Sequence, residues 1–456
     1  MKRNQFFVLF TMILSLLLAF QISAMADNAD LPDDLKEIGE EAFYGDQSIT
    51  SLTIPDGAET IGARAFAYSG LEQIYIPASV TVIPSDAFDG VQNLTIVSPF
   101  DAPARAYAFE HQGIKWQGDV PITSLAFPDG NFRNVVRSYD SNADGTLSVA
   151  EIQVVTEITC DTQEIADLRG IEFFSALTSL NCQENQLASL DVSNNTALTV
   201  LRCYDNQLTS LDVSHNPALT TLSCYDNALT ALDVSQNPAL ETLACSNNQI
   251  TGIDVSNNQN LQELSCNNNS QLESVNVSNN SSLISLYCNS CPSLTNLNVQ
   301  SCTSLELLSA NGSGLTGLDV SNNRNLKILF CWRNNLTNLN LNQNNALVRV
   351  NLSANQNMNQ LTLGQAPELE MLWVQNTALT QIDISGAPII VDAYQNGEQA
   401  EFYGNGQVAL PGESGNYGFY GYMIGNGINS YSQMEVDHYN FNVSKNLVIN
   451  NAIKTV

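Results

Sequence analysis

A twelve-residue stretch of this chain carries oxygen-bearing side chains at alternate positions. It begins at Asp140, ends at Glu151 and has Gly145 at its sixth position. A sharp turn at a glycine, surrounded by carboxylate, amide and carbonyl oxygens, suits a hard cation such as Ca²⁺. The expected ligands are the side chains of Asp140, Asn142, Asp144, Ser148 and Glu151 and the backbone carbonyl of Thr146. Glu151 would bind with both carboxylate oxygens, and Ser148 directly or through a water molecule.

This spacing fits the EF-hand calcium loop at every diagnostic position. Upstream, Phe132, Val135, Val136 and Tyr139 have the spacing of an amphipathic helix, with Asp129 as its predicted N-cap. The sequence shows no second loop of this kind, whereas calcium sensors usually carry paired loops. We therefore expect one structural Ca²⁺ site with an affinity of roughly 10⁻⁴ to 10⁻³ M. The alternative is a turn rich in Asp and Asn that binds nothing.

Most of the cysteines recur at steps of 21 or 22 residues. They are Cys160, Cys182, Cys203, Cys224, Cys245, Cys266, Cys288 and Cys331. Ala310, Leu352 and Val374 occupy the same column, which indicates an apolar core position. Thiols that point the same way from parallel strands have poor disulfide geometry, so a buried ladder of mostly free thiols is predicted. A bridge between Cys291 and Cys302 stays open, and Cys288 with Cys291 matches a C-x-x-C motif by spacing alone.

The cysteine column belongs to a repeat that reads L-x-x-L-x-C-x-x-N-x-L-x-x-L-D-V-S-x-N. Its period falls in the leucine-rich-repeat range, so we expect about ten coils of a β-rich solenoid over residues 155–385. Asparagine amides at one position of each coil are expected to satisfy backbone groups where the coil turns. That column contains Asn185, Asn206, Asn227, Asn248, Asn269, Asn334 and Asn355. The aspartates of the L-D-V step are expected to be solvated on the convex side.

Other regions surround this array. Residues 31–117 repeat every 22 or 23 residues, with I-G-x-x-A-F blocks or their variants at Ile38, Ile61 and Ile83, and three such copies predict a small solenoid. Residues 121–175 are expected to form a small helical cap that contains the calcium loop. Residues 386–456, rich in Gly, Asn and Tyr, are expected to form a β-rich C-terminal cap.

Composition and the N-terminus limit the classes of function. Residues 1–26 read as a secretory signal peptide, and no later apolar run is long enough to span a membrane. The chain has 16 Lys and Arg against 46 Asp and Glu, a formal charge of −30. An acidic surface of this kind argues against nucleic-acid and anionic-lipid partners. We therefore expect a secreted protein, possible cell-surface association, and no membrane insertion after signal cleavage.

Two resemblances follow from these motifs. The I-G-x-x-A-F repeats resemble the BspA-like leucine-rich repeats of bacterial surface proteins. The calcium-loop cap, the cysteine column and the L-D-V-S step together resemble internalin J-like proteins over about residues 121–385. The resemblance implies a noncatalytic role in adhesion or host interaction and does not identify a ligand.

The residues beside the buried Leu and Cys of each strand are expected to line a concave binding surface. Most are small and polar, so the aromatic ones are the candidates for ligand contact. The predicted ligand-binding residues are Tyr204, Tyr225, Phe330, Trp332, Arg333, Arg349 and Trp373. The partner would be a protein loop or a surface glycan. The competing interpretation is scattered surface aromatics, or aromatics covered by the C-terminal segment.

No residue constellation points to catalysis. The histidines are His111, His215 and His438, and neither H-E-x-x-H nor G-x-S-x-G occurs. The sequence therefore predicts a binding protein and not an enzyme, with a glycan-binding module as the first alternative and a secreted hydrolase as a remote one.

Overall fold

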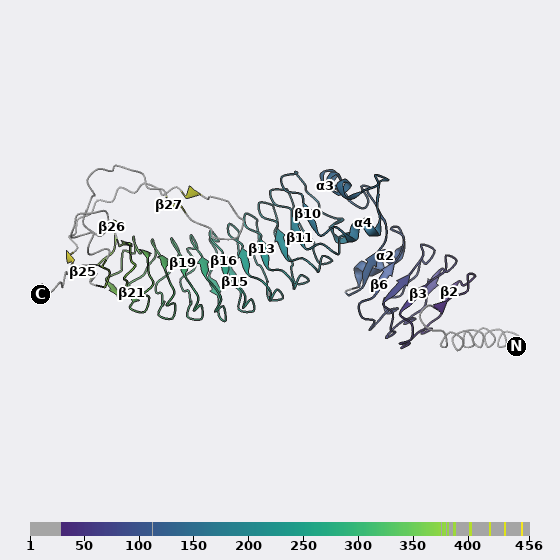
Figure 1. Cartoon of the computed structure of the whole chain (residues 1–456), viewed down its shortest axis with the longest axis horizontal. Helices are drawn as coiled ribbons and strands as arrows, with labels where there is room; N and C mark the ends of the chain where they lie inside the picture. The colour runs from purple at the N-terminus through teal and green to yellow at the C-terminus, as the bar shows by residue number, and fades with distance from the viewer. Residues whose placement is uncertain are drawn as a thin grey trace. The chain divides into compact units, whose positions relative to one another are not determined.

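The computed structural model divides the chain into two compact units, Met1–Val155 and Thr156–Val456 (Figure 1). The structure describes residues 29–111, 113–374, 376–379, 381–382, 386–388, 401–403, 419–420, 433–434 and 448–449. The predicted signal peptide, residues 1–26, lies outside the described residues. Within them, no helix combines the length and the apolar character needed to cross a membrane.

The first unit contains a five-stranded parallel sheet. Its strands are β1 (Ala29–Asp30), β3 (Ser51–Thr53), β5 (Gln73–Tyr75), β6 (Thr95–Val97) and β7 (Lys115–Gln117). A second parallel pair, β2 (Glu37–Ile38) and β4 (Thr60–Ile61), runs along the same coils. The sequence predicted three copies of the repeat, which is too few. The coils of β6 and β7 join the sheet without the full I-G-x-x-A-F block, because helix α2 (Pro103–Glu110) takes its place.

The core of the first unit is a stack of aromatic rings. The Phe43, Phe66 and Phe88 rings lie parallel at centroid distances of 5.2 and 5.1 Å. Tyr107 of α2 closes the stack edge-on, 5.7 Å from Phe88. Each Phe ring therefore packs against the Phe ring of the next coil, which explains why the block recurs once per coil.

The calcium-loop segment of the first unit is built from short elements. They are β8 (Val120–Pro121), α3 (Gly130–Val136), the 3₁₀ turn η1 (Arg137–Tyr139), β9 (Thr146–Leu147) and α4 (Val149–Gln153). The Asp129 side chain accepts hydrogen bonds from the backbone N–H groups of Asn131 and Phe132, which confirms the predicted N-cap of α3.

The second unit is a solenoid whose coils follow one another along the chain, each adding a strand to one parallel sheet (Figure 1). Its strands are β10 (Glu157–Thr159), β11 (Ser179–Asn181), β12 (Val200–Arg202), β13 (Thr221–Ser223), β14 (Thr242–Ala244), β16 (Glu263–Ser265), β18 (Ser285–Tyr287), β19 (Leu307–Ser309), β20 (Ile328–Phe330), β22 (Arg349–Asn351), β24 (Met371–Trp373) and β26 (Glu401–Tyr403). Strand β26 pairs with β24, so this sheet extends beyond residue 385, where the sequence analysis ended the array.

Shorter elements complete the second unit. They are the 3₁₀ turn η2 (Ile171–Phe173) and the pairs β15 (Gly252–Asp254) with β17 (Ser274–Asn276), β21 (Asn338–Leu341) with β23 (Gln360–Leu363), β25 (Gln381–Ile382) with β29 (Val448–Ile449), and β27 (Phe419–Tyr420) with β28 (Gln433–Met434). Only the last of these pairs is antiparallel.

The interior of the second unit confirms the cysteine prediction. All ten cysteines are buried and free, so Cys291 and Cys302 are not bridged. Burial raises the pKa of Cys245 and Cys331 to about 12 and that of Cys302 to about 11. Thiols held in the protonated form and away from solvent are poor nucleophiles and poor metal ligands, so the ladder is a packing feature.

The asparagine column is confirmed as a hydrogen-bonding column. In a typical coil, the Asn206 side-chain oxygen accepts from the backbone N–H of Leu187, and its amide donates to the carbonyl oxygens of Cys182, Cys203 and Tyr204. Each asparagine therefore connects two successive coils at the point where the chain leaves the strand.

Candidate functional site

The predicted calcium loop is closed by hydrogen bonds between its own side chains and backbone. The Asp140 carboxylate accepts from the N–H of Gly145 at 2.9 Å and from the N–H of Asp144 at 3.3 Å. The Asn142 side-chain oxygen also accepts from the Asp144 N–H, at 2.9 Å. Gly145 has φ +84°, a conformation that favours glycine. The loop thus adopts the sharp turn on which the sequence prediction depends.

Glu151, the last residue of the loop, has both carboxylate oxygens in hydrogen bonds. One accepts from the N–H and the hydroxyl of Ser141, at 2.8 and 2.6 Å. The other accepts from the N–H and the hydroxyl of Ser148, at 2.9 and 2.8 Å, in a capping box at the start of α4. These bonds, the Ser141 hydroxyl first, lower the pKa of Glu151 to about 2. The carboxylate is therefore ionised at neutral pH.

The strand at the end of the calcium loop pairs with a strand of the same unit. Strand β9 pairs antiparallel with β8, which sets the buried Leu147 opposite Val120. The Asp119 carboxylate accepts from the N–H of Val149 at the start of α4, at 3.0 Å. A single loop is thus held in shape without a second loop beside it.

The oxygen ligands of the loop suit calcium, although its carboxylates do not lie close together around one point. The predicted ligands supply only hard oxygen atoms, the ligand type that Ca²⁺ prefers. Across the described ranges, no group of three or more His, Cys, Asp or Glu side chains is close enough to hold a metal ion. Binding with both oxygens of Glu151 would require this side chain to give up its bonds to Ser141 and Ser148.

The predicted ligand-contact residues lie on the outward-facing side of the main sheet, here called the sheet face, in two groups. Tyr204 and Tyr225 follow β12 and β13, and their rings stack at 4.2 Å with an interplanar angle of 12°. The other group is on β20, β22 and β24 and the residues that follow β20, and it consists of Phe330, Trp332, Arg333, Arg349 and Trp373. At the usual strand spacing the two groups are about 24 Å apart, so the structure does not combine them into one small site.

Both groups have charged residues at their edges. Glu184, Asp205 and Asp226 are exposed beside the tyrosine pair. Partial desolvation of the Asp226 carboxylate, and then the charge of Asp205, raise the pKa of Asp226. In the second group the Arg333 guanidinium lies 5.6 Å from the centre of the Trp332 ring, and Arg349 is exposed. Lys327, also nearby, is paired with Glu306 at 2.8 Å. One end of the sheet face is thus acidic and the other carries arginines.

A chain of hydrogen bonds crosses the coils between the two groups and reaches the second one. The side-chain oxygens of Ser246, Asn267, Asn289 and Asn311 each accept from the backbone N–H of the next residue in the column, and the last bond ends on Trp332. Side chains fixed in this way lose little conformational entropy when a ligand binds. The middle of the sheet face is therefore a rigid polar strip.

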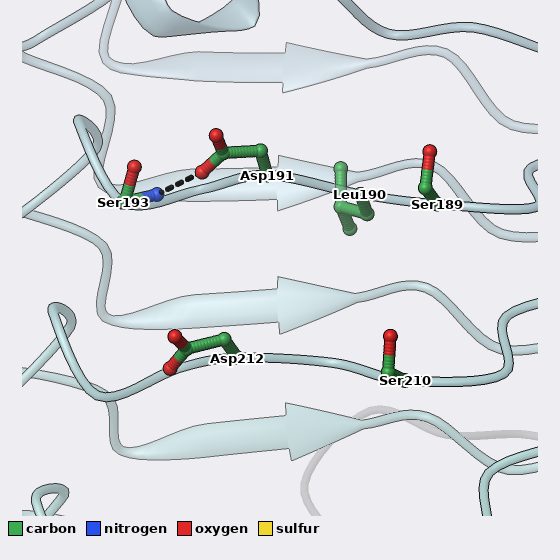
Figure 2. Close-up of a pocket in the computed structure, with 6 residues that line it drawn as sticks. All are labelled: Ser189, Leu190, Asp191, Ser193, Ser210 and Asp212. Carbon is green, nitrogen blue, oxygen red and sulfur yellow. Dashed lines mark hydrogen bonds between the residues drawn. The ribbon is translucent and has the colours of Figure 1, made fainter. Parts of the chain in front are cut away.

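The aspartates of the L-D-V step form the wall of an open pocket on another side of the coils. Figure 2 shows Asp191 and Asp212 on neighbouring coils, with Asp191 accepting from the N–H of Ser193 at 2.9 Å. The pocket encloses about 340 Å³ and is lined by Ser189, Leu190, Asp191, Ser193, Ser210 and Asp212. Hydrogen bonds from Ser214 lower the pKa of Asp212. These exposed carboxylates cap their own turns, which agrees with the predicted solvated column.

Sequence reasoning missed a second asparagine column, at the end of each L-D-V-S-x-N step. Asn216, for example, is fully buried and donates to the carbonyl oxygens of Val192 and Asn195 at 3.0 and 2.9 Å. The column contains Asn195, Asn216, Asn237, Asn258, Asn280, Asn323 and Asn344. The signal was present as the last letter of the repeat, but a polar residue next to solvated aspartates gave no reason to expect burial.

Comparison with known proteins connects these features to described repeats. A family model described as BspA type leucine-rich repeat region matches residues 18–115 in 6 copies. Internalin J of Listeria monocytogenes is 38% identical over 71 residues, which is 15% of this chain. This chain covers 8% of the length of that relative.

Solved structures of Listeria monocytogenes proteins are also similar. The functional domain of InlJ, whose description includes a cysteine ladder, matches with 29% identity and a TM-score of 0.42, over 60% of this chain and 75% of that one. The internalin InlF matches with 19% identity and a TM-score of 0.49, over 64% and 94%. With BspA-type repeats in its first unit, and with internalin J among its relatives in sequence, this chain is an internalin-like bacterial leucine-rich-repeat protein.

Proposed function

We propose that this chain is a noncatalytic binding protein, secreted or at the cell surface, that holds a protein partner against the sheet face of its second unit. The observation that carries the proposal is the presence of two aromatic groups on one rigid sheet face, about 24 Å apart. A pair of anchors at this separation suits a folded partner, because standard protein interfaces bury about 800 Å² on each side.

The charges of the sheet face favour a partner that is itself unevenly charged. Glu184, Asp205 and Asp226 would attract a basic region, whereas Arg333 and Arg349 would attract an acidic one. Aromatic and arginine side chains are the residue types that most often dominate binding energy. The rigid strip of Ser246 and the three asparagines would complete the contact between the two anchors.

Alanine substitution of each aromatic group tests this proposal. The double variants Tyr204→Ala/Tyr225→Ala and Trp332→Ala/Trp373→Ala would each be assayed by surface plasmon resonance against a panel of purified extracellular host proteins. We expect each double variant to weaken binding to the same panel member by about tenfold or more, since truncated anchors cost over 1 kcal/mol each.

The matched control is Asp191→Asn/Asp212→Asn, which changes two exposed carboxylates away from the sheet face and should leave affinity unchanged. The proposal fails if no panel member binds, or if both aromatic variants bind as tightly as the parent chain. Affinity confined to an array of glycans would instead favour the glycan-binding alternative.

We further propose that the loop from Asp140 to Glu151 holds a structural Ca²⁺. Asp140, Asn142, Asp144, Thr146, Ser148 and Glu151 would supply its oxygen ligands. Support comes from the turn at Gly145 and from the ionised Glu151. The ion would fix the loop between α3 and α4, where helix ends depend on the loop's own hydrogen bonds.

Calorimetric titration of the full chain with CaCl₂, combined with thermal melts, tests the calcium proposal. At 10 mM Ca²⁺ and the expected affinity, the stabilisation is about 1.4 to 2.7 kcal/mol, which raises the melting temperature by a few degrees. Glu151→Gln should abolish both the heat and the shift, whereas Asp101→Asn, at an exposed carboxylate of the same unit, should preserve them. A parent chain that gives neither heat nor shift would show that the loop binds no calcium.

A further inference from the structure

Two tyrosines form an exposed aromatic pair on the first unit, on coils that carry none of the binding residues discussed so far. Tyr44 is 44% exposed and Tyr68 is 53% exposed. Their rings meet edge to face, with centroids 5.7 Å apart and planes at 73°. Large hydrophobic side chains exposed to this degree are few among the described residues. Adjacent exposed aromatic rings usually mark a contact surface.

The backbone of Tyr68 is unfavourable for a tyrosine. Its φ is +56°, in the left-handed region that glycine adopts without strain. The backbone ladder places Tyr68 level with Gly45 of the preceding coil and Gly90 of the following coil, and these glycines have φ of +70° and +73°. Among the non-glycine residues with positive φ in the described chain, Tyr68 is the only aromatic one. The fold would therefore accept glycine at position 68.

The next coil leaves room for the ring of Tyr68. A side-chain carbon added at Gly90 would collide with the Cδ1 and Cε1 atoms of Tyr68. The side-chain amide of Gln47 donates to the carbonyl oxygen of Tyr68 at 2.6 Å, which holds this strained residue in place. Strain that persists at an exposed position is a reason to look for a function.

The charges around the pair select the class of ligand. The Arg64 guanidinium lies over the Tyr44 ring at 4.6 Å and pairs with Glu41 at 3.1 Å. A cation is thus already stacked on this aromatic group, and a cationic ligand would be repelled. Glu41, Asp46 and Asp89 lie on the same turns as the rings and would repel an anion. A neutral ligand rich in hydroxyl groups avoids both penalties.

We propose that Tyr44 and Tyr68 form an aromatic corner that binds a sugar ring of a neutral glycan, with the sugar stacked on the face of one tyrosine ring. The C–H groups on one face of a pyranose ring carry partial positive charge and are attracted to the negative face of a tyrosine ring. Carboxylates and amides on the adjoining turns, Asp46, Gln47 and Asp89, are of the types that hydrogen-bond to sugar hydroxyls. This site is in a different unit from the proposed protein-binding sheet face and does not depend on it.

Isothermal titration of the full-length chain with cellohexaose, mannohexaose and chitohexaose tests the proposal, with a sulfated oligosaccharide as the anionic comparison. We expect at least one neutral hexasaccharide to bind and the sulfated one not to bind. Tyr68→Gly should weaken the neutral glycan by at least tenfold while the melting temperature stays level or rises, because glycine relieves the backbone strain. Tyr44→Ala should weaken binding in the same direction.

The matched control is Leu125→Ala, which removes another large exposed hydrophobic side chain of the same unit and should leave glycan affinity unchanged. The proposal is overturned if none of the neutral hexasaccharides binds, if Tyr68→Gly binds as well as the parent chain, or if the control variant is the one that loses binding. Failure of the sheet face to bind a protein would not affect any of these outcomes.

Discussion

Raising the pH from 8 to 10 is expected to remove most of the stability of the second unit, because its cysteine ladder must stay protonated to stay folded. Eight thiols form the ladder, and all are buried and free. Burial raises the pKa of Cys160, Cys245 and Cys331 to about 12, and it raises the pKa of the other five well above the ordinary value. An unfolded chain ionises its cysteines near pH 8.5.

The direction of the effect follows from linkage. A group whose pKa is higher in the folded state stabilises the fold fully below its unfolded pKa and loses that contribution as the pH rises towards its folded pKa. The stabilisation that these thiols provide is therefore lost between about pH 8.5 and pH 12. At pH 10 each protonated thiol costs about 2 kcal/mol relative to the unfolded chain. Several thiols together equal the whole stability of an ordinary domain, about 5–15 kcal/mol.

Urea unfolding followed by far-UV circular dichroism at pH 8 and pH 10, in a reducing buffer, measures the loss. The matched variant is Cys224→Ala, since Ala310 occupies the same column in another coil. This variant should lose about 2 kcal/mol less than the parent chain between the two pH values, because it has one thiol fewer to ionise. Equal losses would show that the ladder does not oppose ionisation and that the alkaline sensitivity arises elsewhere.

The sequence was sufficient to predict the ladder because its evidence was internal. Ala310, Leu352 and Val374 replace cysteine in the same column, and only an apolar core position accepts all four side chains. Parallel stacking then argued against disulfides within the column on geometric grounds. The Asp129 cap of α3 was equally accessible, because capping depends on a few adjacent residues.

Features that depend on contacts between coils could not be predicted in this way. The sequence predicted that Glu151 would be a calcium ligand, but its bonds to Ser141 and Ser148 depend on how the loop closes. The backbone strain at Tyr68 is recognised only when its coil is aligned with the coils of Gly45 and Gly90. The sequence predicted too few copies of this repeat. Local sequence patterns thus predict where the strands and helices lie. The partners of a side chain on a neighbouring coil, or across a loop, can be identified only from the three-dimensional structure.

The burial of the second asparagine column was likewise not predicted from the sequence. The two asparagine columns differ in how many hydrogen bonds each side chain makes, so substitutions in them should differ in their cost to stability. Asn248 is 7% exposed and makes four hydrogen bonds. Its side-chain oxygen accepts from the N–H of Leu229, and its amide donates to carbonyl oxygens in two successive coils, those of Cys224, Cys245 and Ser246. The side chain of Asn237, in the second column, makes only two hydrogen bonds, to the carbonyl oxygens of Val213 and Asn216.

Asn248→Ala is therefore expected to lower the free energy of unfolding of the second unit by about 3–5 kcal/mol. It leaves the N–H of Leu229 without its acceptor, at about 1–3 kcal/mol, and removes three further hydrogen bonds at about 1 kcal/mol each. Asn237→Ala should lower it by about 2 kcal/mol, because it removes only two hydrogen bonds, to carbonyl oxygens that each keep a backbone N–H donor. Urea midpoints at pH 7 give both values. The chain supplies its own intermediate case, since Ser313 stands in the first column and its hydroxyl donates to the carbonyl oxygen of Cys288 at 2.7 Å. Asn248→Ser should accordingly fall between the parent chain and Asn248→Ala, and equal losses for Asn248→Ala and Asn237→Ala would mean that the N–H of Leu229 finds another partner.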